Sequence, residues 1–119
     1  MDKRVEIFTN DVLSLIDNKC KIVDKSLEAG PFSTIGLRFS CNSKLKEDYK
    51  LYCEYNHVEV ERKYWFNKIT IELQFFLYNY SLDKTMQIPK ENFDLICKEL
   101  KKIDTDTVEF FLDKVEKNS

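Results

Sequence analysis

The feature that most constrains this chain is an unbroken two-residue alternation over residues 68–80. Apolar side chains occupy every odd position from Ile69 to Leu77, and polar or aromatic side chains occupy the even positions. Successive side chains of a strand point to opposite faces, and β-branched and aromatic residues favour strands. Because no Gly or Pro interrupts the segment, we predict a long strand in the middle of a sheet.

Two earlier segments show the same period. Residues 33–41 alternate cleanly between apolar and polar side chains, which predicts a half-buried strand. Residues 49–64 predict another strand, but its apolar positions are odd-numbered up to Tyr55 and even-numbered from Val58 onward. A regular strand cannot bring both sets to one face, so we expect a β-bulge or a tight turn at residues 56–57.

The connections between these segments are short. A hairpin turn near residues 66–68 would join two of the strands, and residues 85–88 predict a short edge strand. Residues 21–28 are ambiguous. Consecutive strands with short connections favour antiparallel pairing, so we expect an antiparallel sheet of three to four strands.

Helical periodicity marks both ends of the chain. Apolar side chains at three- and four-residue steps predict a helix over residues 3–19, with a strand at residues 4–8 and a helix from Thr9 as the alternative. Pro89 suits the first turn of a helix, and cap-type residues at 104–105 divide the C-terminal segment into two helices. We therefore predict a single α+β domain over the whole chain, with the N-terminal helix and the two C-terminal helices packed mainly on one face of the sheet.

Composition excludes several classes of function. No apolar run reaches the roughly 18–20 residues of a membrane span, and the N-terminus lacks the apolar core of a secretory signal, so we expect a cytoplasmic protein with no membrane partner. The 19 basic side chains are outnumbered by 21 acidic ones, for a net charge of −2. Only Arg4, Arg38 and Arg62 are arginines, which argues against nucleic acid as the partner.

The cysteines are scattered along the chain. They form no C-x₂-C pair, and with a single histidine they complete no zinc site, so we expect no metal and no cofactor. In a reducing cytoplasm we expect buried thiols, with a disulfide between Cys41 and Cys53 as the alternative. The four cysteines are Cys20, Cys41, Cys53 and Cys97.

His57 is the main candidate for acid–base catalysis, because its ordinary pKa lies near neutrality and Glu54, Glu59 and Glu61 are close in sequence. A Cys–His pair would need an activated thiol, such as that of Cys53, beside it. The chain contains none of the Gly-rich, Ser-nucleophile or metalloprotease motifs. We therefore interpret His57 as a histidine at the strand irregularity and expect no catalytic residue.

The candidate partner-binding residues are aromatic and have acidic neighbours. If the odd positions of residues 68–80 pack against the helices, the even positions face away from them, and exposed aromatic patches usually mark interfaces. The alternative is that residues 21–32, or a return of the first helix, cover this face as a second small core. The predicted partner-binding residues are Tyr64, Trp65, Phe66, Phe76, Tyr78 and Tyr80, bordered by Glu59, Glu61 and Glu72.

Our leading functional hypothesis is a small protein-binding module that acts stoichiometrically by covering a functional surface of another protein. An inhibitor, an immunity-type protein or an antagonist made by a phage or mobile element would act in this way. The carboxylates suit a partner with a basic surface. The alternative is a small-molecule-binding domain or modest enzyme with a pocket between sheet and helices, lined by Tyr52, Tyr55 and Trp65 with His57 at its mouth. A homodimer formed through residues 68–80 is a third class.

Overall fold

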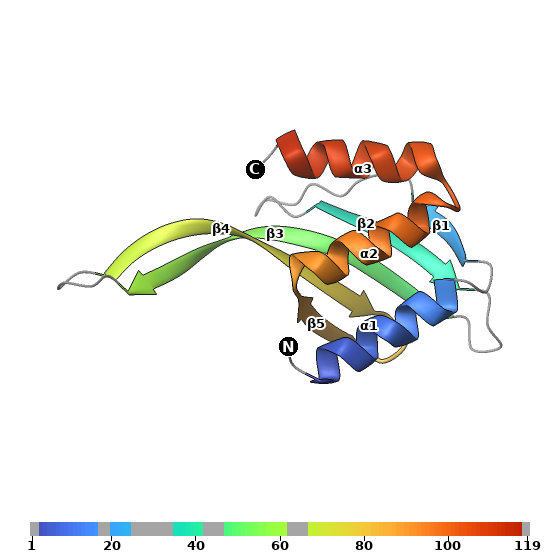
Figure 1. The fold of residues 1–119 in the computed structure, drawn as a ribbon, viewed down its shortest axis with the longest axis horizontal. Coiled ribbons are helices and arrows are strands. Elements are labelled where there is room, and N and C mark those ends of the chain that lie inside the picture. The colour runs from blue at the N-terminus through green and yellow to red at the C-terminus, as the bar shows by residue number, and fades with distance from the viewer. Residues whose placement is uncertain (1–2, 17–19, 25–34, 42–46, 62–66, 118–119) are drawn as a thin grey trace.

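The computed structural model describes residues 3–16, 20–24, 35–41, 47–61 and 67–117. Its element order confirms the expected α+β class, with one helix at the N-terminal end and two at the C-terminal end (Figure 1). The elements are α1 (Lys3–Ile16), β1 (Cys20–Asp24), β2 (Ile35–Cys41), β3 (Glu47–Glu61), β4 (Asn67–Asn79), β5 (Lys84–Ile88), α2 (Lys90–Lys101) and α3 (Thr105–Lys117).

The sheet is an antiparallel meander in which strands adjacent in sequence pair with one another, in the order β1-β2-β3-β4-β5. It has five strands rather than the expected three to four, because residues 20–24 form β1. This strand is too short for its alternation to stand out in the sequence. Its pairing with β2, which sets Ile22 opposite Phe39, completes the edge of the sheet.

The β-bulge or turn expected at residues 56–57 is wrong. β3 and β4 pair in one continuous register, from Tyr49 opposite Asn79 to Glu61 opposite Asn67. The change of hydrophobic phase instead coincides with the place where the described parts of the neighbouring strands end, since there β2 pairs with β3 as far as Cys53 and β5 pairs with β4 from Phe75.

Beyond that point β3 and β4 continue as a two-stranded ribbon, here called the arm, made of residues 54–61 and 67–74. Figure 1 shows the arm reaching well past the helices, and the molecule is 54 Å long. A ribbon without a helical layer on it is under no requirement to keep its apolar residues on one face. The change of apolar phase therefore lies where β3 leaves the core, and the pairing of β3 with β4 is regular at that point.

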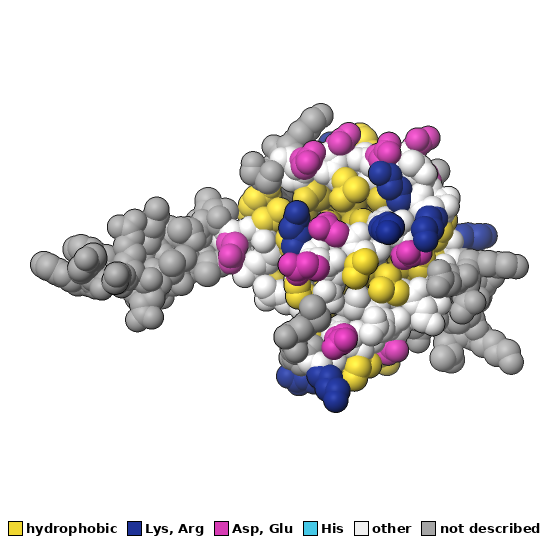
Figure 2. Space-filling view, viewed as in Figure 1, with side chains coloured by type: hydrophobic (Ala, Val, Ile, Leu, Met, Phe, Trp, Pro, Cys, Tyr) yellow, Lys and Arg dark blue, Asp and Glu magenta, His cyan; other side chains and the backbone are white. Residues whose placement is uncertain are grey.

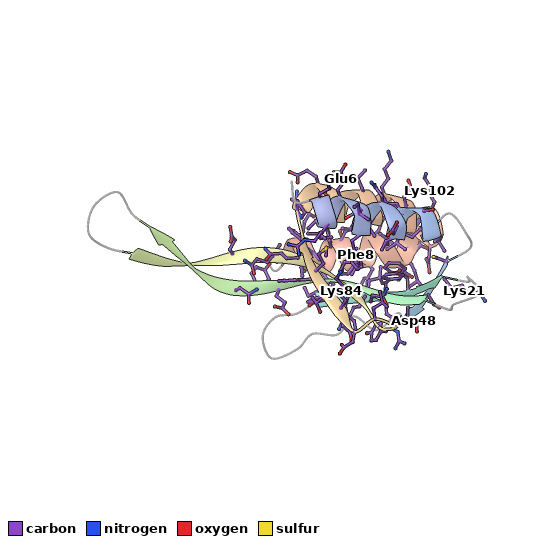
Figure 3. The ribbon with its side chains drawn as sticks, turned by 90° about the horizontal axis from the view of Figure 1, so that it is seen from below. Glu6, Phe8, Lys21, Asp48, Lys84 and Lys102 are labelled. Atoms are coloured by element: carbon purple, nitrogen blue, oxygen red, sulfur yellow. The ribbon has the colours of Figure 1, made fainter. Side chains whose placement is uncertain are left out.

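The helices lie on one face of the sheet, as expected (Figure 3). α3 packs over β2, α2 over β4, and α1 against α2 and β5. The odd positions of β2, β3 and β4 supply the sheet side of the core, including Leu37, Leu51 and Leu77, which are fully buried. The helices supply Val12, Ile16, Phe93, Ile96, Leu100, Val108 and Phe111.

The N-terminal segment is a helix over residues 3–16, so the alternative with a strand at residues 4–8 is wrong. Residues 17–19 lie outside the described part of the chain. A buried hydrogen bond from the Asn92 side-chain amide to the Thr9 hydroxyl, at 2.9 Å, ties α1 to α2. α1 therefore belongs to the core side and does not return over the opposite face.

α3 begins where the cap residues predict, whereas α2 begins at Lys90, so Pro89 is its N-cap residue and lies one position before the first helical turn in which the sequence predicts it. Pro89 precedes α2 and its carbonyl accepts the backbone N–H groups of Asn92 and Phe93. Asp104 caps α3, because its side chain accepts the backbone N–H of Thr107 at 3.2 Å and the Thr107 hydroxyl at 2.8 Å. Within the described ranges, no helix has both the length and the apolar character needed to cross a membrane.

The cysteines correct one expectation and confirm another. Cys20 is disulfide-bonded, so it is not a buried thiol, and the backbone of Cys41 lies directly opposite it in the β1–β2 register. Cys53 is a free thiol, so the alternative Cys41–Cys53 disulfide is wrong. Cys53 and Cys97 are buried thiols within the core, as expected.

Candidate protein-binding surface

The face of the sheet opposite the helices, here called the outer face, is formed by the even-numbered residues of β2, β3 and β4 and the odd-numbered residues of β5. The register sets Tyr52 opposite Phe76 and Lys50 opposite Tyr78. The described side chains on this face are Arg38, Ser40, Asp48, Lys50, Tyr52, Glu54, Asn56, Glu72, Gln74, Phe76, Tyr78, Thr85 and Gln87, with Lys21 of β1 opposite Ser40, continued by Tyr80 and Asp83 after β4.

Four rings gather on the outer face, and we call them the aromatic cluster: Tyr52, Phe76, Tyr78 and Tyr80. The rings of Tyr52 and Phe76 stack with centroids 5.2 Å apart, and those of Tyr78 and Tyr80 meet edge to face at 4.8 Å. Tyr80 is 38% exposed, and the other three side chains are half-buried. Rings held by one another in this way present a rigid apolar surface.

Two cations lie against the aromatic cluster. The Arg38 guanidinium carbon is 4.3 Å from the centre of the Tyr80 ring, and the Lys50 ammonium nitrogen is 5.7 Å from the centre of the Tyr52 ring. Lys50 fits there because Gly36 has no Cβ atom, which would otherwise collide with the lysine side chain. The absence of a side chain at Gly36 therefore opens room for a lysine stem beside the cluster.

Arg38 is fixed from its other side by Asp48. Its guanidinium nitrogen lies 2.8 Å from the Asp48 carboxylate, and the backbone N–H of Tyr80 donates to the Asp48 carbonyl at 2.9 Å. Hydrogen bonds from Ser40 and Arg38 lower the pKa of Asp48. Asp48 thus stays ionised at neutral pH and orients the arginine over the ring.

The turn after β4 positions the other edge of the cluster. Asp83 adopts a positive φ of 48°, and its carboxylate accepts a 2.5 Å hydrogen bond from the Tyr78 hydroxyl. This bond is the main reason that the pKa of Tyr78 is raised. The Asn79 side chain accepts the backbone N–H of Leu82 at 3.1 Å, which closes the turn.

Polar and acidic side chains of the arm residues next to the sheet continue the outer face. The Asn56 amide donates to the Gln74 side-chain oxygen at 2.7 Å, Glu54 lies beside them, and Glu72 is exposed. The charge therefore changes along the face, from Lys21, Arg38 and Lys50 beside Asp48 and Asp83 at one end to the two carboxylates at the other.

The structure brings only some of the predicted partner-binding residues together. Phe76, Tyr78 and Tyr80 lie side by side on the outer face, as the alternation predicted, and Glu72 lies at its arm end. Glu59 and Glu61 belong to the arm, and their side chains are outside the described part, as are Tyr64, Trp65 and Phe66. The chain enters β4 at Asn67, which is about 40 Å along the strand from Asn79 at 3.3 Å per residue. Of the predicted residues, the described structure therefore places Phe76, Tyr78, Tyr80 and Glu72 on the outer face.

The sequence prediction also missed three members of the outer face. Tyr52 belongs to the aromatic cluster, and Arg38 and Lys50 lie against it. These residues come from β2 and β3, and only the alignment of the strands shows that Tyr52 meets Phe76 and that Arg38 meets Tyr80. The alternation of residues 33–41 does place Arg38 on the polar side of its strand. What the alternation leaves open is which neighbour that residue contacts.

The pocket predicted for a small-molecule or enzyme function is only partly present. A hollow of about 570 Å³ does lie between α2, α3 and β4, but Tyr52 faces the opposite side of the sheet, so its predicted role as a lining residue is wrong. Tyr55 is not among the residues that line the hollow. The side chain of His57 and the whole of Trp65 lie outside the described part.

The described cysteines are unsuited to nucleophilic catalysis, because burial raises the pKa of Cys53 to about 11 and that of Cys97 to about 12. Among the described side chains, no three His, Cys, Asp or Glu residues gather as metal ligands would. The chain matches no protein-family model, no curated protein and no solved structure.

Proposed function

We propose that this protein is a binding module that acts stoichiometrically, as an inhibitor, immunity-type protein or mobile-element antagonist does, by covering a functional surface of another protein with its outer face. The observation that carries the proposal is the aromatic cluster on a sheet face over which no helix of the described part lies (Figure 3). Tyrosines are enriched among residues that dominate binding energy. Rings already held in place lose little conformational entropy when a partner docks.

The charge gradient suggests how the partner is oriented. We propose a partner with a basic patch that meets Glu54 and Glu72, while the end near Arg38 and Lys50 meets neutral or acidic groups. Complementary charges of this kind raise the association rate and select the docking direction more than they add affinity. High salt should therefore slow association more than it speeds dissociation.

The arm supplies a second contact region in this proposal. A two-stranded ribbon is marginally stable on its own in water, so the arm gains stability when a partner covers it. Among the described residues, β2 does not pair with β3 beyond Cys53 and β5 does not pair with β4 before Phe75, so no described strand covers the outward edges of the arm and their backbone hydrogen-bonding groups. Glu59 and Glu61, with Tyr64, Trp65 and Phe66, remain predicted contacts of this region.

The decisive experiment compares capture of binding partners by matched variants. The full-length protein is used as bait in an extract of its native host, beside the Tyr78→Ala/Tyr80→Ala variant and a Phe110→Ala control. Phe110 is 53% exposed on α3, so the control removes an exposed ring from the helical side. We expect one protein to be retained in 1:1 ratio by the unchanged chain and the control, and lost from the outer-face variant.

Equal capture by all three baits, or no capture by the unchanged chain at micromolar concentration, contradicts the proposal. The mass of the isolated protein across a concentration series separates it from self-association. The homodimer is supported instead if the mass of the unchanged protein doubles as its concentration rises while the Tyr78→Ala/Tyr80→Ala variant stays at the monomer mass. Loss of turnover in a folded His57→Ala variant supports the enzyme alternative.

We propose the cytoplasm as the compartment, and the Cys20 disulfide makes this proposal testable. Disulfides are rare in reducing compartments and persist in oxidising ones. Protein isolated from its native host under acid quench is denatured and alkylated without reductant. Alkylation of all 4 cysteines supports the cytoplasm. Alkylation of Cys53 and Cys97 alone contradicts it.

A further inference from the structure

The β4 edge of the arm lies open among the residues that the structure describes. β5 pairs with β4 from Phe75 to Asn79, and the chain leaves the sheet after Ile88 to enter α2. Residues 67–74 of β4 therefore pair with β3 on one edge and with no described strand on the other. Every second residue of such an edge presents its backbone N–H and C=O groups outward, which is a template for a further strand.

The sequence of this edge is self-complementary. It contains three β-branched residues in a row, Ile69, Thr70 and Ile71, and neither Gly nor Pro. Its two charged residues are Lys68 and Glu72, which lie two positions on either side of Thr70. A two-fold axis at Thr70 therefore sets the cation of each strand opposite the carboxylate of the other.

We propose that two copies of this protein pair through this edge, with their β4 strands antiparallel about a two-fold axis at Thr70. In this register Lys68 of each copy lies opposite Glu72 of the other. Ile69 lies opposite Ile71, and Thr70 lies opposite Thr70. Opposite charges, β-branched pairs and Thr–Thr pairs at directly opposite positions each stabilise antiparallel strands. The strand thus supplies its own complement at five successive positions, which favours a second copy as the occupant of the edge.

Other arrangements of two copies match fewer of these residues. The next possible register has its axis at Ile71 and sets Lys68 opposite Gln74. Glu72 then lies opposite Thr70, so neither charge is matched. The β3 edge of the arm carries three carboxylates and no Lys or Arg, so like charges oppose the pairing of two copies there. These carboxylates belong to Glu54, Glu59 and Glu61.

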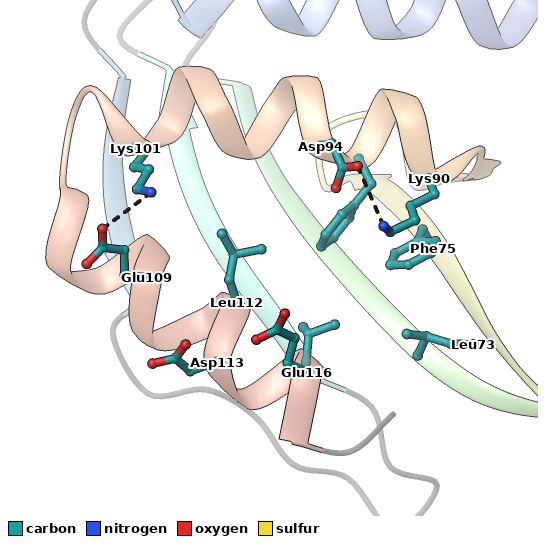
Figure 4. Close-up of a pocket in the computed structure, with 11 residues that line it drawn as sticks. Leu73, Phe75, Lys90, Asp94, Lys101, Glu109, Leu112, Asp113 and Glu116 are labelled. Carbon is teal, nitrogen blue, oxygen red and sulfur yellow. Dashed lines mark ion pairs between the residues drawn. The ribbon is translucent and has the colours of Figure 1, made fainter.

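The same register covers apolar surface at the root of the arm. Leu73 lies where the helical layer ends, and it lines the hollow of about 570 Å³ between α2, α3 and β4 (Figure 4). Its side chain is only partly buried, and Figure 2 shows hydrophobic surface gathered in this region. Pairing sets Asn67 of the second copy opposite Leu73, so the end of one arm reaches the hollow of the other copy. Apolar surface that is removed from water in this way favours association.

The pairing leaves the aromatic cluster free, because the cluster lies on a face of the sheet and the two copies meet at an edge. The two-fold axis is perpendicular to the joined sheet, so the outer faces of the two copies continue one another across the arms. A four-stranded arm is also more stable than a two-stranded ribbon. That the pair presents two partner-binding surfaces rests on the proposed function, whereas the pairing itself does not.

The mass of the full chain, measured by sedimentation from micromolar to millimolar concentration, tests the pairing. We expect the mass to double, and to double equally in the Tyr78→Ala/Tyr80→Ala variant, because the aromatic cluster takes no part. The amides of residues 67–73 should exchange more slowly with solvent as the dimer forms. A monomer mass at every concentration overturns the proposal, as does a dimer that the Tyr78→Ala/Tyr80→Ala variant loses.

Charge reversal tests the register. Lys68→Glu and Glu72→Lys each set like charges opposite one another on both sides of the two-fold axis, and each should weaken the dimer about tenfold or more. The double variant Lys68→Glu/Glu72→Lys restores both matched pairs and should dimerise within about threefold of the unchanged chain. Within one copy these positions lie opposite Val60 and Asn56, so no variant sets like charges directly opposite each other inside the arm.

Lys98→Glu, at an exposed position on α2, is the matched control. It changes the net charge as much as Lys68→Glu does and should leave the dimer unchanged. Lys68→Glu and Glu72→Lys shift the net charge in opposite directions, so net charge cannot explain a loss in both. Equal weakening by Lys98→Glu, or a double variant as weak as the single ones, overturns the proposal. Failure of the outer face to capture a partner leaves these masses unchanged, so this proposal and the proposed function fail separately.

Discussion

Phe75 and Phe76 are neighbours on β4 and carry the same ring, yet they lie in different environments. Phe75 points to the helices, is 8% exposed and lies 4.5 Å from the ring of Phe93. Phe76 points to the outer face, is half-buried and stacks on Tyr52. Three helices pack on the helical face. In the part of the chain that the structure describes, no helix lies over the outer face, where the side chains contact one another. One face packs into the core, and the other carries the aromatic cluster on the side away from the helices.

The largest expected effect comes from this matched pair. Phe75→Ala should lower the free energy of unfolding by about 3–5 kcal/mol, because it removes a buried ring that packs on Phe93 and leaves a void beside the hollow. Phe76→Ala should cost about 1–2 kcal/mol, the value of a half-buried ring and one stacking contact. Urea unfolding of the two variants measures both losses. Equal losses would show that the outer face is as tightly closed as the helical one.

A second pair compares hydrogen bonds on the two faces. Thr9→Val leaves the buried amide of Asn92 without its partner and should cost about 1–3 kcal/mol. Asn56→Ala, which breaks the bond to Gln74 on the outer face, should cost less than about 1 kcal/mol, because water replaces it. Thermal unfolding gives both values. If the double variant Thr9→Val/Asn92→Leu is no more stable than Thr9→Val, the unmet amide is not the cause.

The pH dependence of stability tests the Arg38–Asp48 pair on the outer face. The pKa of Asp48 is lowered in the folded state, so its carboxylate contributes stability above its ordinary pKa and loses it as pH falls through the folded-state value. Asp48→Asn should therefore cost about 0.5–1 kcal/mol at pH 7, a modest value because solvent screens the pair. The difference from the unchanged chain should shrink below about pH 4. A gap that is constant from pH 3 to 7 contradicts this origin.

The smallest effect is expected from the Tyr55 hydroxyl of β3, compared with that of Tyr52. The Tyr55 hydroxyl is buried without a hydrogen-bond partner, so Tyr55→Phe should leave stability unchanged or raise it by up to about 1 kcal/mol. Tyr52 bonds to Thr85 on the outer face, so Tyr52→Phe should cost about 0.5–1.5 kcal/mol. Calorimetry resolves the sign. A loss on Tyr55→Phe would show that this hydroxyl does have a partner.

Strand and helix types could be predicted from the sequence wherever a segment repeats its period several times. The odd positions of β4 from Leu73 to Leu77 and the apolar stripes of α2 and α3 are such cases, and each of these parts lies against the core. Residues 20–24 could not be predicted, because a five-residue strand offers too few repeats and is stabilised by its neighbour. The bulge expected near His57 failed for a related reason. The apolar phase is constrained only where a helical layer covers the strand.

The candidate surface was predicted less completely than the fold. Phe76, Tyr78 and Tyr80 follow from the alternation of a single strand, since a strand sends successive side chains to opposite faces. Their partners do not follow from it. That Arg38 lies over Tyr80, and that Lys50 crosses Gly36 to reach Tyr52, depends on how β2, β3 and β4 are aligned.

What the amino-acid sequence alone determined, therefore, is which residues turn toward the interior. The spacing of apolar side chains sets this direction, because side chains two residues apart in a strand, or three to four apart in a helix, point to the same side. The tertiary structure decided which residues became neighbours. It added β1 to the sheet, set the disulfide at Cys20, extended β3 and β4 into the arm and placed the cations on the aromatic cluster. Strand register and helix placement arise from contacts between segments distant in the chain, and no local period encodes them.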